Sequence, residues 1–156
     1  TVGEYVVPTV KMMAEIIEKT EHSPFDDLYQ TLELNFKNEY ATLVRSVYTL
    51  AQSFHTKAIA VVSVRGFTAK LISHFRPDQA ILVATSYQSV YQKSALWWGV
   101  EAFLIENKQG FHAMAEELLR RAQHTRRLAA GQQVTLLLGR DERYSDMQLV
   151  GVRQVK

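Results

Sequence analysis

From residue 58 onward, short apolar runs alternate with stretches whose apolar positions recur every three or four residues. Short apolar runs between turn residues are typical of strands buried on both faces of a sheet, and helical spacing is typical of amphipathic helices. The predicted strands are residues 58–62, 80–84, 100–105 and 134–138, with an alternating edge strand at 147–155. The predicted helices between them are residues 66–75, 89–97 and 110–128. This alternation indicates a three-layer α/β/α domain with a mainly parallel sheet.

The N-terminal third of the chain predicts helices. Pro8 suits the first turn of a helix because its missing N–H would be unpaired there anyway, and Val10, Met13 and Ile17 continue at helical spacing. A second helix is predicted at residues 35–54. Its expected apolar face consists of Phe36, Tyr40, Leu43, Val47, Leu50 and Phe54, with Val44 and Ala51 beside them.

A chain of 156 residues is long enough for one domain with a sizeable core. We therefore expect a single domain over residues 1–156, with N-terminal helices at 1–55 and an alternating β/α core at 56–156. The chain begins with Thr1 rather than Met, and we interpret it as a domain excised from a longer protein.

The turn between the first predicted strand and the helix after it carries the most informative chemistry. It consists of Ser63, Val64, Arg65, Gly66, Phe67 and Thr68. Backbone N–H groups at a helix start point outward, and the helix dipole favours negative charge there. Ser63 and Thr68 add hydroxyl groups, Gly66 allows close approach to the backbone, and Arg65 adds charge. The turn is a candidate phosphate site, although the same residue types also suit simple capping and turn geometry.

Composition excludes several other classes of function. The absence of cysteine excludes thiol catalysis, disulfides and thiolate metal sites, and it suits a reducing cytoplasm. A formal net charge of +2 is too small to argue for nucleic acid or a membrane surface. No apolar run reaches the roughly 18 residues of a membrane span. The histidines lack metal-ligand spacing, and no nucleotide or hydrolase motif is present. We therefore predict no catalytic residue, no metal site, and no nucleic-acid or membrane partner.

Several segments resemble, in order, the motifs of one known family. Residues 61–77 (VVSVRGFTAKLISHFRP) resemble T-x-S/T-G-x-S/T-A-x-x-I/V-S-x-x-R-P, 80–85 (AILVAT) resemble P-I-I-A-V-T, 96–100 (LWWGV) resemble L-x-x-G-V, and 131–139 (GQQVTLLLG) resemble G-D-x-V-V-V-V-x-G. Residues 1–8 and 10–21 are similar to E-T-A-x-G-x-Y-P and A-V-x-x-M-x-x-I-x-x-x-T/A-E. These are motifs of the C-terminal domain of pyruvate kinases, and the resemblance covers essentially the whole chain. It implies a five-stranded mixed sheet whose last strand is antiparallel at the edge.

The resemblance also implies a role for the turn, which in many pyruvate kinases holds a phosphate of an allosteric sugar phosphate. Gly66 and Thr68 match the family pattern, Ser63 replaces a usual Thr, and Arg65 replaces a Ser or Thr. The second effector loop of the family usually ends G-T/S-T-N. Here residues 139–146 read GRDERYSD, so that Arg140 and Arg143 are the only candidates for a second phosphate contact in that loop.

The resemblance therefore implies a regulatory and subunit-contact domain that is not catalytic by itself. The parent enzyme would convert phosphoenolpyruvate and ADP to pyruvate and ATP in glycolysis, with Mg²⁺ and K⁺. Implied partners are a sugar phosphate or nucleotide effector, the catalytic barrel of the same parent chain, and further copies in a cytoplasmic homo-oligomer. Two alternatives stay open: a stand-alone ligand-binding module, and a purely structural or oligomerisation module with a degenerate effector site.

Overall fold

The computed structural model describes residues 3–21, 39–106, 110–139 and 149–156. The chain divides into two compact units, Thr1–Asn35 and Phe36–Lys156. The first unit contains helix α1 (Val6–Glu21), all of whose residues are exposed. The helix predicted near Pro8 is thus present. Whether residues 1–156 act as a single domain stays a prediction.

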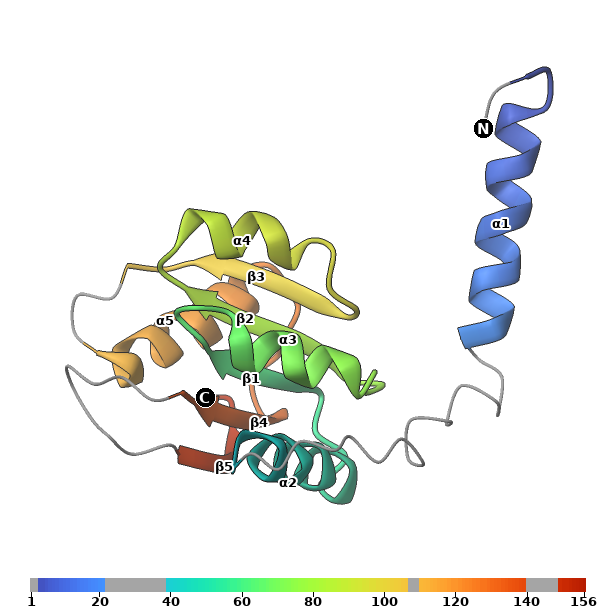
Figure 1. The fold of residues 1–156 in the computed structure, drawn as a ribbon. Helices are drawn as coiled ribbons and strands as arrows, with labels where there is room; N and C mark the ends of the chain where they lie inside the picture. The colour runs from blue at the N-terminus through green and yellow to red at the C-terminus, as the bar shows by residue number, and fades with distance from the viewer. Residues whose placement is uncertain (1–2, 22–38, 107–109, 140–148) are drawn as a thin grey trace. The chain divides into compact units, whose positions relative to one another are not determined.

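The second unit is built on a five-stranded sheet (Figure 1). Its strands are β1 (Ala58–Val62), β2 (Ala80–Thr85), β3 (Val100–Leu104), β4 (Gln133–Leu138) and β5 (Leu149–Gln154). They lie in the order β3-β2-β1-β4-β5, and only β5 runs antiparallel to its neighbour. The predicted mixed sheet with an antiparallel edge strand is therefore confirmed. Residues 147 and 148 of that predicted strand lie outside the described residues.

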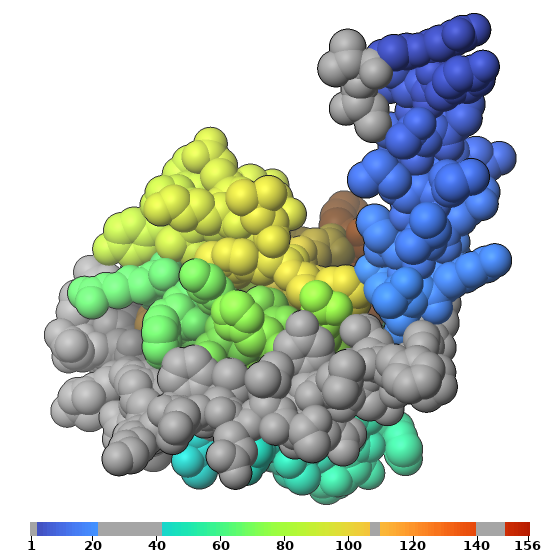
Figure 2. Space-filling view, turned by 45° about the vertical axis from the view of Figure 1, so that its right-hand side comes forward, coloured from blue at the N-terminus to red at the C-terminus, as the bar shows by residue number. Residues whose placement is uncertain are grey.

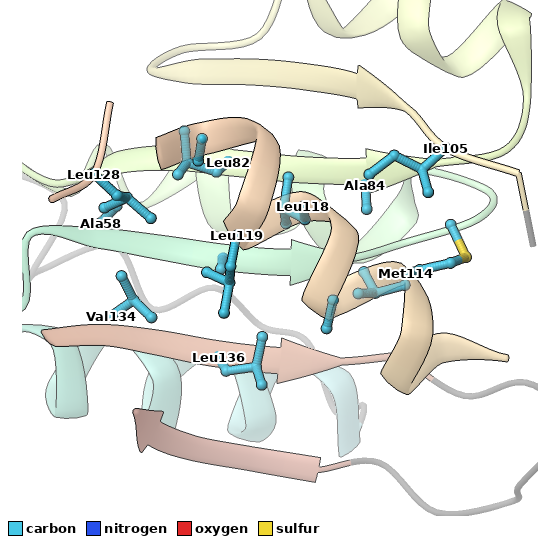
Figure 3. Close-up of a cluster of buried hydrophobic side chains, with 14 of the residues drawn as sticks. Ala58, Leu82, Ala84, Ile105, Met114, Leu118, Leu119, Leu128, Val134 and Leu136 are labelled. Carbon is cyan, nitrogen blue, oxygen red and sulfur yellow. The ribbon is translucent and has the colours of Figure 1, made fainter. Parts of the chain in front are cut away.

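Helices cover both faces of this sheet, which confirms the three-layer α/β/α architecture. One face carries α2 (Glu39–Ser53) and α3 (Phe67–His74), whose buried residues form one core cluster with the strands. On the same face, α4 (Gln88–Ser94) lies beside α3 (Figure 2). The other face is covered by α5 (Phe111–His124), which points Met114, Leu118 and Leu119 at β1, β2 and β4 (Figure 3).

The predicted apolar face of α2 needs a correction. The fully buried residues are Val44, Val47 and Ala51, whereas Leu43 and Leu50 are half-buried and Phe54 is exposed. The buried line is rotated because α2 packs against β4, β5 and α3 together, so that the side chains facing this junction are small. Phe36, the first residues of the predicted helix and the side chain of Tyr40 lie outside the described part of the chain.

The predicted helix at residues 110–128 ends earlier than expected. Helix α5 stops at His124, where the backbone N–H of Thr125 donates to Arg121 and Gln123. Arg126 then adopts a left-handed backbone with φ 59°, which turns the chain out of the helix. The apolar position at Leu128 is buried by this turn and not by a further helical turn. Leu128 continues the helical spacing of apolar residues, so the sequence predicted a longer helix. Periodicity alone does not show whether such a residue is buried by a helix or by the turn after it.

Candidate phosphate-binding turn

The turn at residues 63–68 lies where the strand order of the sheet reverses. Strand β1 is in the centre, and the chain leaves it toward β2 on one side while β4 returns on the other. Ligands of parallel sheets bind at such a switch point, beyond the carboxyl ends of the strands. After β4, Gly139 donates its N–H to the carbonyl of Val62 at 3.1 Å. The structure thus places the turn at the edge of the sheet where ligands of such folds bind.

Gly66 is the N-cap of α3 and has a left-handed backbone, with φ 76° and ψ −6°. Its N–H donates to Ser63 at 3.3 Å, and its carbonyl accepts the first helical hydrogen bond from Lys70 at 2.9 Å. Because a glycine has no side chain, no side-chain hydrogen bond caps the first turn of the helix. A glycine suits this position because a left-handed residue with a Cβ is strained. That Gly66 allows a ligand to approach the backbone stays a prediction.

The six residues of the turn divide between surface and interior. Arg65 and Phe67 are exposed and Val64 is half-buried. Ser63 and Thr68 are only 5% and 7% exposed, so that their hydroxyl groups lie largely beneath the surface. The structure thus brings all the predicted residues into one turn, with Arg65 as its exposed charge. The prediction that both hydroxyls bind phosphate stays a prediction.

Residue Thr85 connects this turn to the next one and was missed by the sequence reasoning. Its buried hydroxyl donates to the carbonyl of Val64 at 2.8 Å and accepts from the N–H of Tyr87 at 3.3 Å. The sequence contained a signal for this contact, because neighbouring parallel strands end at the same edge of a sheet. A hydroxyl directly after the second predicted strand, at residue 85, therefore lies within reach of the first turn.

The space beneath Gly66 is filled by Val90 of α4 and by Trp97, which follows that helix. A Cβ placed on Gly66 would lie 2.6 Å from Cγ1 of Val90 and 2.7 Å from Cη2 of Trp97. Trp97 is half-buried and packs against the core cluster on this face of the sheet. Substitution of Gly66 by aspartate, a natural test of an anion site, would thus disturb packing as well as charge.

The second candidate loop, with Arg140 and Arg143, lies outside the described residues. Gly139, the last described residue before it, approaches β1 so closely that a Cβ there would lie 3.0 Å from the Val62 carbonyl oxygen. Whether the two arginines reach a ligand stays a prediction.

The arginines at the end of α5 are paired with acidic side chains. Glu117 accepts hydrogen bonds from Arg120 at 2.7 and 2.8 Å and from Arg121 at 2.6 Å, and these bonds lower the pKa of Glu117 to about 2. Arg127 pairs with Glu101 at 2.7 Å. Glu116 accepts a hydrogen bond from Arg153 of β5 at 2.9 Å. The cluster therefore ties α5 to its surroundings and leaves little uncompensated positive charge.

Two kinds of feature are absent from the described part of the chain. Within residues 3–21, 39–106, 110–139 and 149–156, no group of three or more histidine or acidic side chains is arranged to hold a metal ion. None of the helices in those ranges combines the length and the hydropathy that crossing a membrane requires.

Comparison with known proteins gives a consistent result. The family model described as pyruvate kinase, alpha/beta domain, matches residues 41–148. Over 143 residues the chain is 30% identical to the pyruvate kinase of Lactobacillus delbrueckii subsp. bulgaricus, covering 88% of this chain and 24% of that protein. Over 110 residues it is 34% identical to the Chlamydia muridarum pyruvate kinase, covering 65% of this chain and 22% of that protein.

A solved structure shares the fold. The pyruvate kinase of Cryptosporidium parvum in complex with ADP superposes with a TM-score of 0.79 at 18% identity, over 99% of this chain and 32% of that one. The chain spans about a quarter of the length of the curated relatives that it matches. On the match of the family model, this chain belongs to the pyruvate kinase family, as its C-terminal α/β domain.

Proposed function

We propose that this chain is the regulatory and subunit-contact domain of a pyruvate kinase, and that the turn at residues 63–68 binds the phosphate group of a small phosphorylated effector. The observation that carries this proposal is the position of the α3 start at the switch point of the sheet, where the helix is capped by a left-handed Gly66. The family to which the chain belongs supports it, because an effector phosphate at this turn is what the resemblance implies.

In this proposal the backbone and Arg65 carry the binding. The N–H groups in the first turn of α3 present partial positive charge to the phosphate oxygens, and a dianion is favoured by the helix dipole. The exposed Arg65 guanidinium adds a charge-assisted hydrogen bond. Ser63 and Thr68, which are nearly buried, would support the turn and add a hydroxyl only after a small local movement.

The chain itself would carry out no chemistry. In the parent protein, a catalytic barrel would transfer the phosphoryl group of phosphoenolpyruvate to ADP, in glycolysis and in the cytoplasm. The Mg²⁺ and K⁺ of that reaction would be bound outside the residues described here, whose side chains offer no cluster of metal ligands. Effector binding would act on the distant site through a coupling free energy, typically about 1–3 kcal/mol.

Thermal unfolding tests the binding. The chain is heated with inorganic phosphate, fructose bisphosphate, glucose 6-phosphate, ribose 5-phosphate and AMP in turn. A ligand at about 100 times its dissociation constant adds roughly 2.7 kcal/mol to the free energy of unfolding. We expect one of the organic phosphates to raise the melting temperature by several degrees. If none of them does, the effector-binding proposal is rejected.

Two charge-reversal variants locate the site. Arg65→Glu places a negative charge on the exposed part of the turn and should abolish the stabilisation by the active ligand. Lys57→Glu makes the same change of charge at an exposed position just before β1, at the opposite edge of the sheet, and should retain that stabilisation. Equal losses in the two variants would mean that the ligand responds to overall charge and not to the turn.

An assembly role is the second candidate, and α1 favours it. Tyr5, Val10, Met13, Ile16 and Ile17 are all more than half exposed. A helix with this much exposed apolar surface suggests a contact with another copy or another domain. Analytical ultracentrifugation of the chain and of a Val10→Glu/Ile17→Glu variant tests it. A stable oligomer that the variant loses, together with no stabilising phosphate, would favour assembly as the main role.

A further inference from the structure

We propose that Trp97 is the positioning residue of the phosphate-binding turn. It holds the backbone of Gly66 from beneath without being part of the surface that a ligand would touch. This inference deepens the proposed function, because it assigns the group that keeps the start of α3 in its binding geometry. It rests on contacts within the second unit of the chain.

The contact between Trp97 and Gly66 is close and rigid. A Cβ on Gly66 would lie 2.7 Å from Cη2 and 3.4 Å from Cζ3 of the indole, and 2.6 Å from Cγ1 of Val90. The tip of the ring therefore fills the space that a side chain at residue 66 would occupy. Gly66 is needed both for its left-handed backbone and for this approach.

The indole is itself fixed from several sides. It packs against the buried cluster that contains Ile72, Ile81 and Val83. Its backbone N–H donates to Ser94 at 3.0 Å at the end of α4, and its carbonyl accepts from Val100 at 3.4 Å at the start of β3. A side chain held by a helix, a strand and a core cluster cannot follow the turn if the turn moves, so that it acts as a support.

A smaller side chain at residue 97 should loosen the geometry of the turn. Gly66 donates its N–H to Ser63 at 3.3 Å, a long hydrogen bond that closes the turn. A smaller ring at residue 97 leaves a gap under Gly66, into which the backbone can relax. The turn then loses its fixed geometry, and the N–H groups at the start of α3 lose the common direction that a phosphate needs.

The neighbouring tryptophan provides a matched control. Trp98 is also half-buried, but its ring is stacked with the guanidinium of Arg76 at 4.6 Å. Arg76 follows the C-cap of α3, at the end of that helix opposite to Gly66. Replacement of Trp98 by phenylalanine therefore removes an indole from the same dipeptide without removing the contact beneath the turn.

The first measurement needs no ligand. Amide hydrogen exchange and the amide resonance of Gly66 are compared in the unmodified chain, Trp97→Phe and Trp98→Phe. We expect Trp97→Phe to shift the Gly66 resonance and to accelerate its exchange at least about fivefold more than the exchange of buried amides in β1. Trp98→Phe should leave both quantities as they are. An unchanged Gly66 amide in Trp97→Phe would overturn the assignment.

Val47→Ala separates positioning from a general loss of stability. Val47 is fully buried in the same core cluster but belongs to α2. This variant should lower the melting temperature without selectively accelerating exchange at Gly66. A selective effect at Gly66 in Val47→Ala equal to that in Trp97→Phe would contradict a specific role for Trp97.

The second measurement uses the phosphate ligand that stabilises the unmodified chain. Isothermal titration should show at least about fivefold weaker binding to Trp97→Phe and unchanged binding to Trp98→Phe and Val47→Ala. Unchanged affinity in Trp97→Phe would overturn the proposal. If no phosphate binds even the unmodified chain, the proposed effector function fails, while the exchange of Gly66 still decides whether Trp97 positions the turn.

Discussion

Two strand-to-helix junctions lie at the same edge of the sheet, and their helices begin at N-cap residues of opposite character. The junction from β1 to α3 turns at Gly66, which is buried and left-handed and has Val90 of α4 and the indole of Trp97 against it. The junction from β2 to α4 turns at Tyr87, which is exposed and extended, with φ −101° and ψ 120°. Neither N-cap residue forms a side-chain capping hydrogen bond.

This difference shows why only one junction is a candidate site. At Tyr87 a large side chain occupies the N-cap position of a seven-residue helix, and the turn needs no special backbone conformation. At Gly66 the chain lacks a side chain, accepts a conformation that other residues avoid, and is supported by Val90 and Trp97. A strained backbone conformation of this kind is typical of positions where a ligand must approach the backbone closely.

The largest effect on the free energy of unfolding is expected from a substitution of Gly66 itself. Gly66→Ala adds both backbone strain and a collision with Val90 and Trp97, and should destabilise the domain by about 2–5 kcal/mol. Gly131→Ala is the matched control, because Gly131 has φ 86° but open space around its missing Cβ. Chemical denaturation should give a loss of only about 1–2 kcal/mol there. Equal losses at the two positions would show that packing beneath the turn is unimportant.

An intermediate effect is expected where the two junctions are joined. Thr85→Val keeps the side-chain volume but leaves the carbonyl of Val64 and the N–H of Tyr87 without their partner. A loss of about 1–3 kcal/mol is expected from unfolding curves, since the hydrogen bonds are shielded from water. Thr85→Ser restores the hydroxyl and should recover most of that loss. If Ser behaves like Val, the hydroxyl does not join the junctions.

The smallest expected effect is a gain at the second junction. Tyr87→Ser places a hydroxyl at the N-cap of α4, where it can accept a hydrogen bond from the first turn. The free energy of unfolding should rise by about 0.5–1 kcal/mol relative to Tyr87→Ala, which removes the same ring without adding a cap. If the two variants have the same free energy of unfolding, a side-chain hydrogen bond at the N-cap does not stabilise α4.

Much of the architecture was predictable because it depends on local pattern. The apolar run at residues 58–62 matches β1, and the glycine before Phe67 marked the start of α3. The residues of the turn were identified for the same reason, since they are contiguous. Thr85 was missed because its role joins two segments that are 21 residues apart, which is the separation between it and Val64.

The face of α2 shows where local pattern is insufficient. The spacing of its apolar residues predicted a helix correctly, but the helix carries more apolar residues than the structure buries. The structure buries Val44, Val47 and Ala51 and leaves Phe54 exposed. That choice depends on β4, β5 and α3, which all contact the helix.

The sequence alone determined the alternation of strands and helices, the turn with Gly66, and the resemblance to pyruvate kinases, because each of these depends on local patterns that follow one another along the chain. The tertiary structure decided which hydroxyls are buried, that Thr85 joins two turns, and that Trp97 and not Trp98 supports Gly66. Adjacent tryptophans are equivalent in a sequence. They differ in the fold because the chain turns between them, which sends one indole beneath the helix start and the other to Arg76.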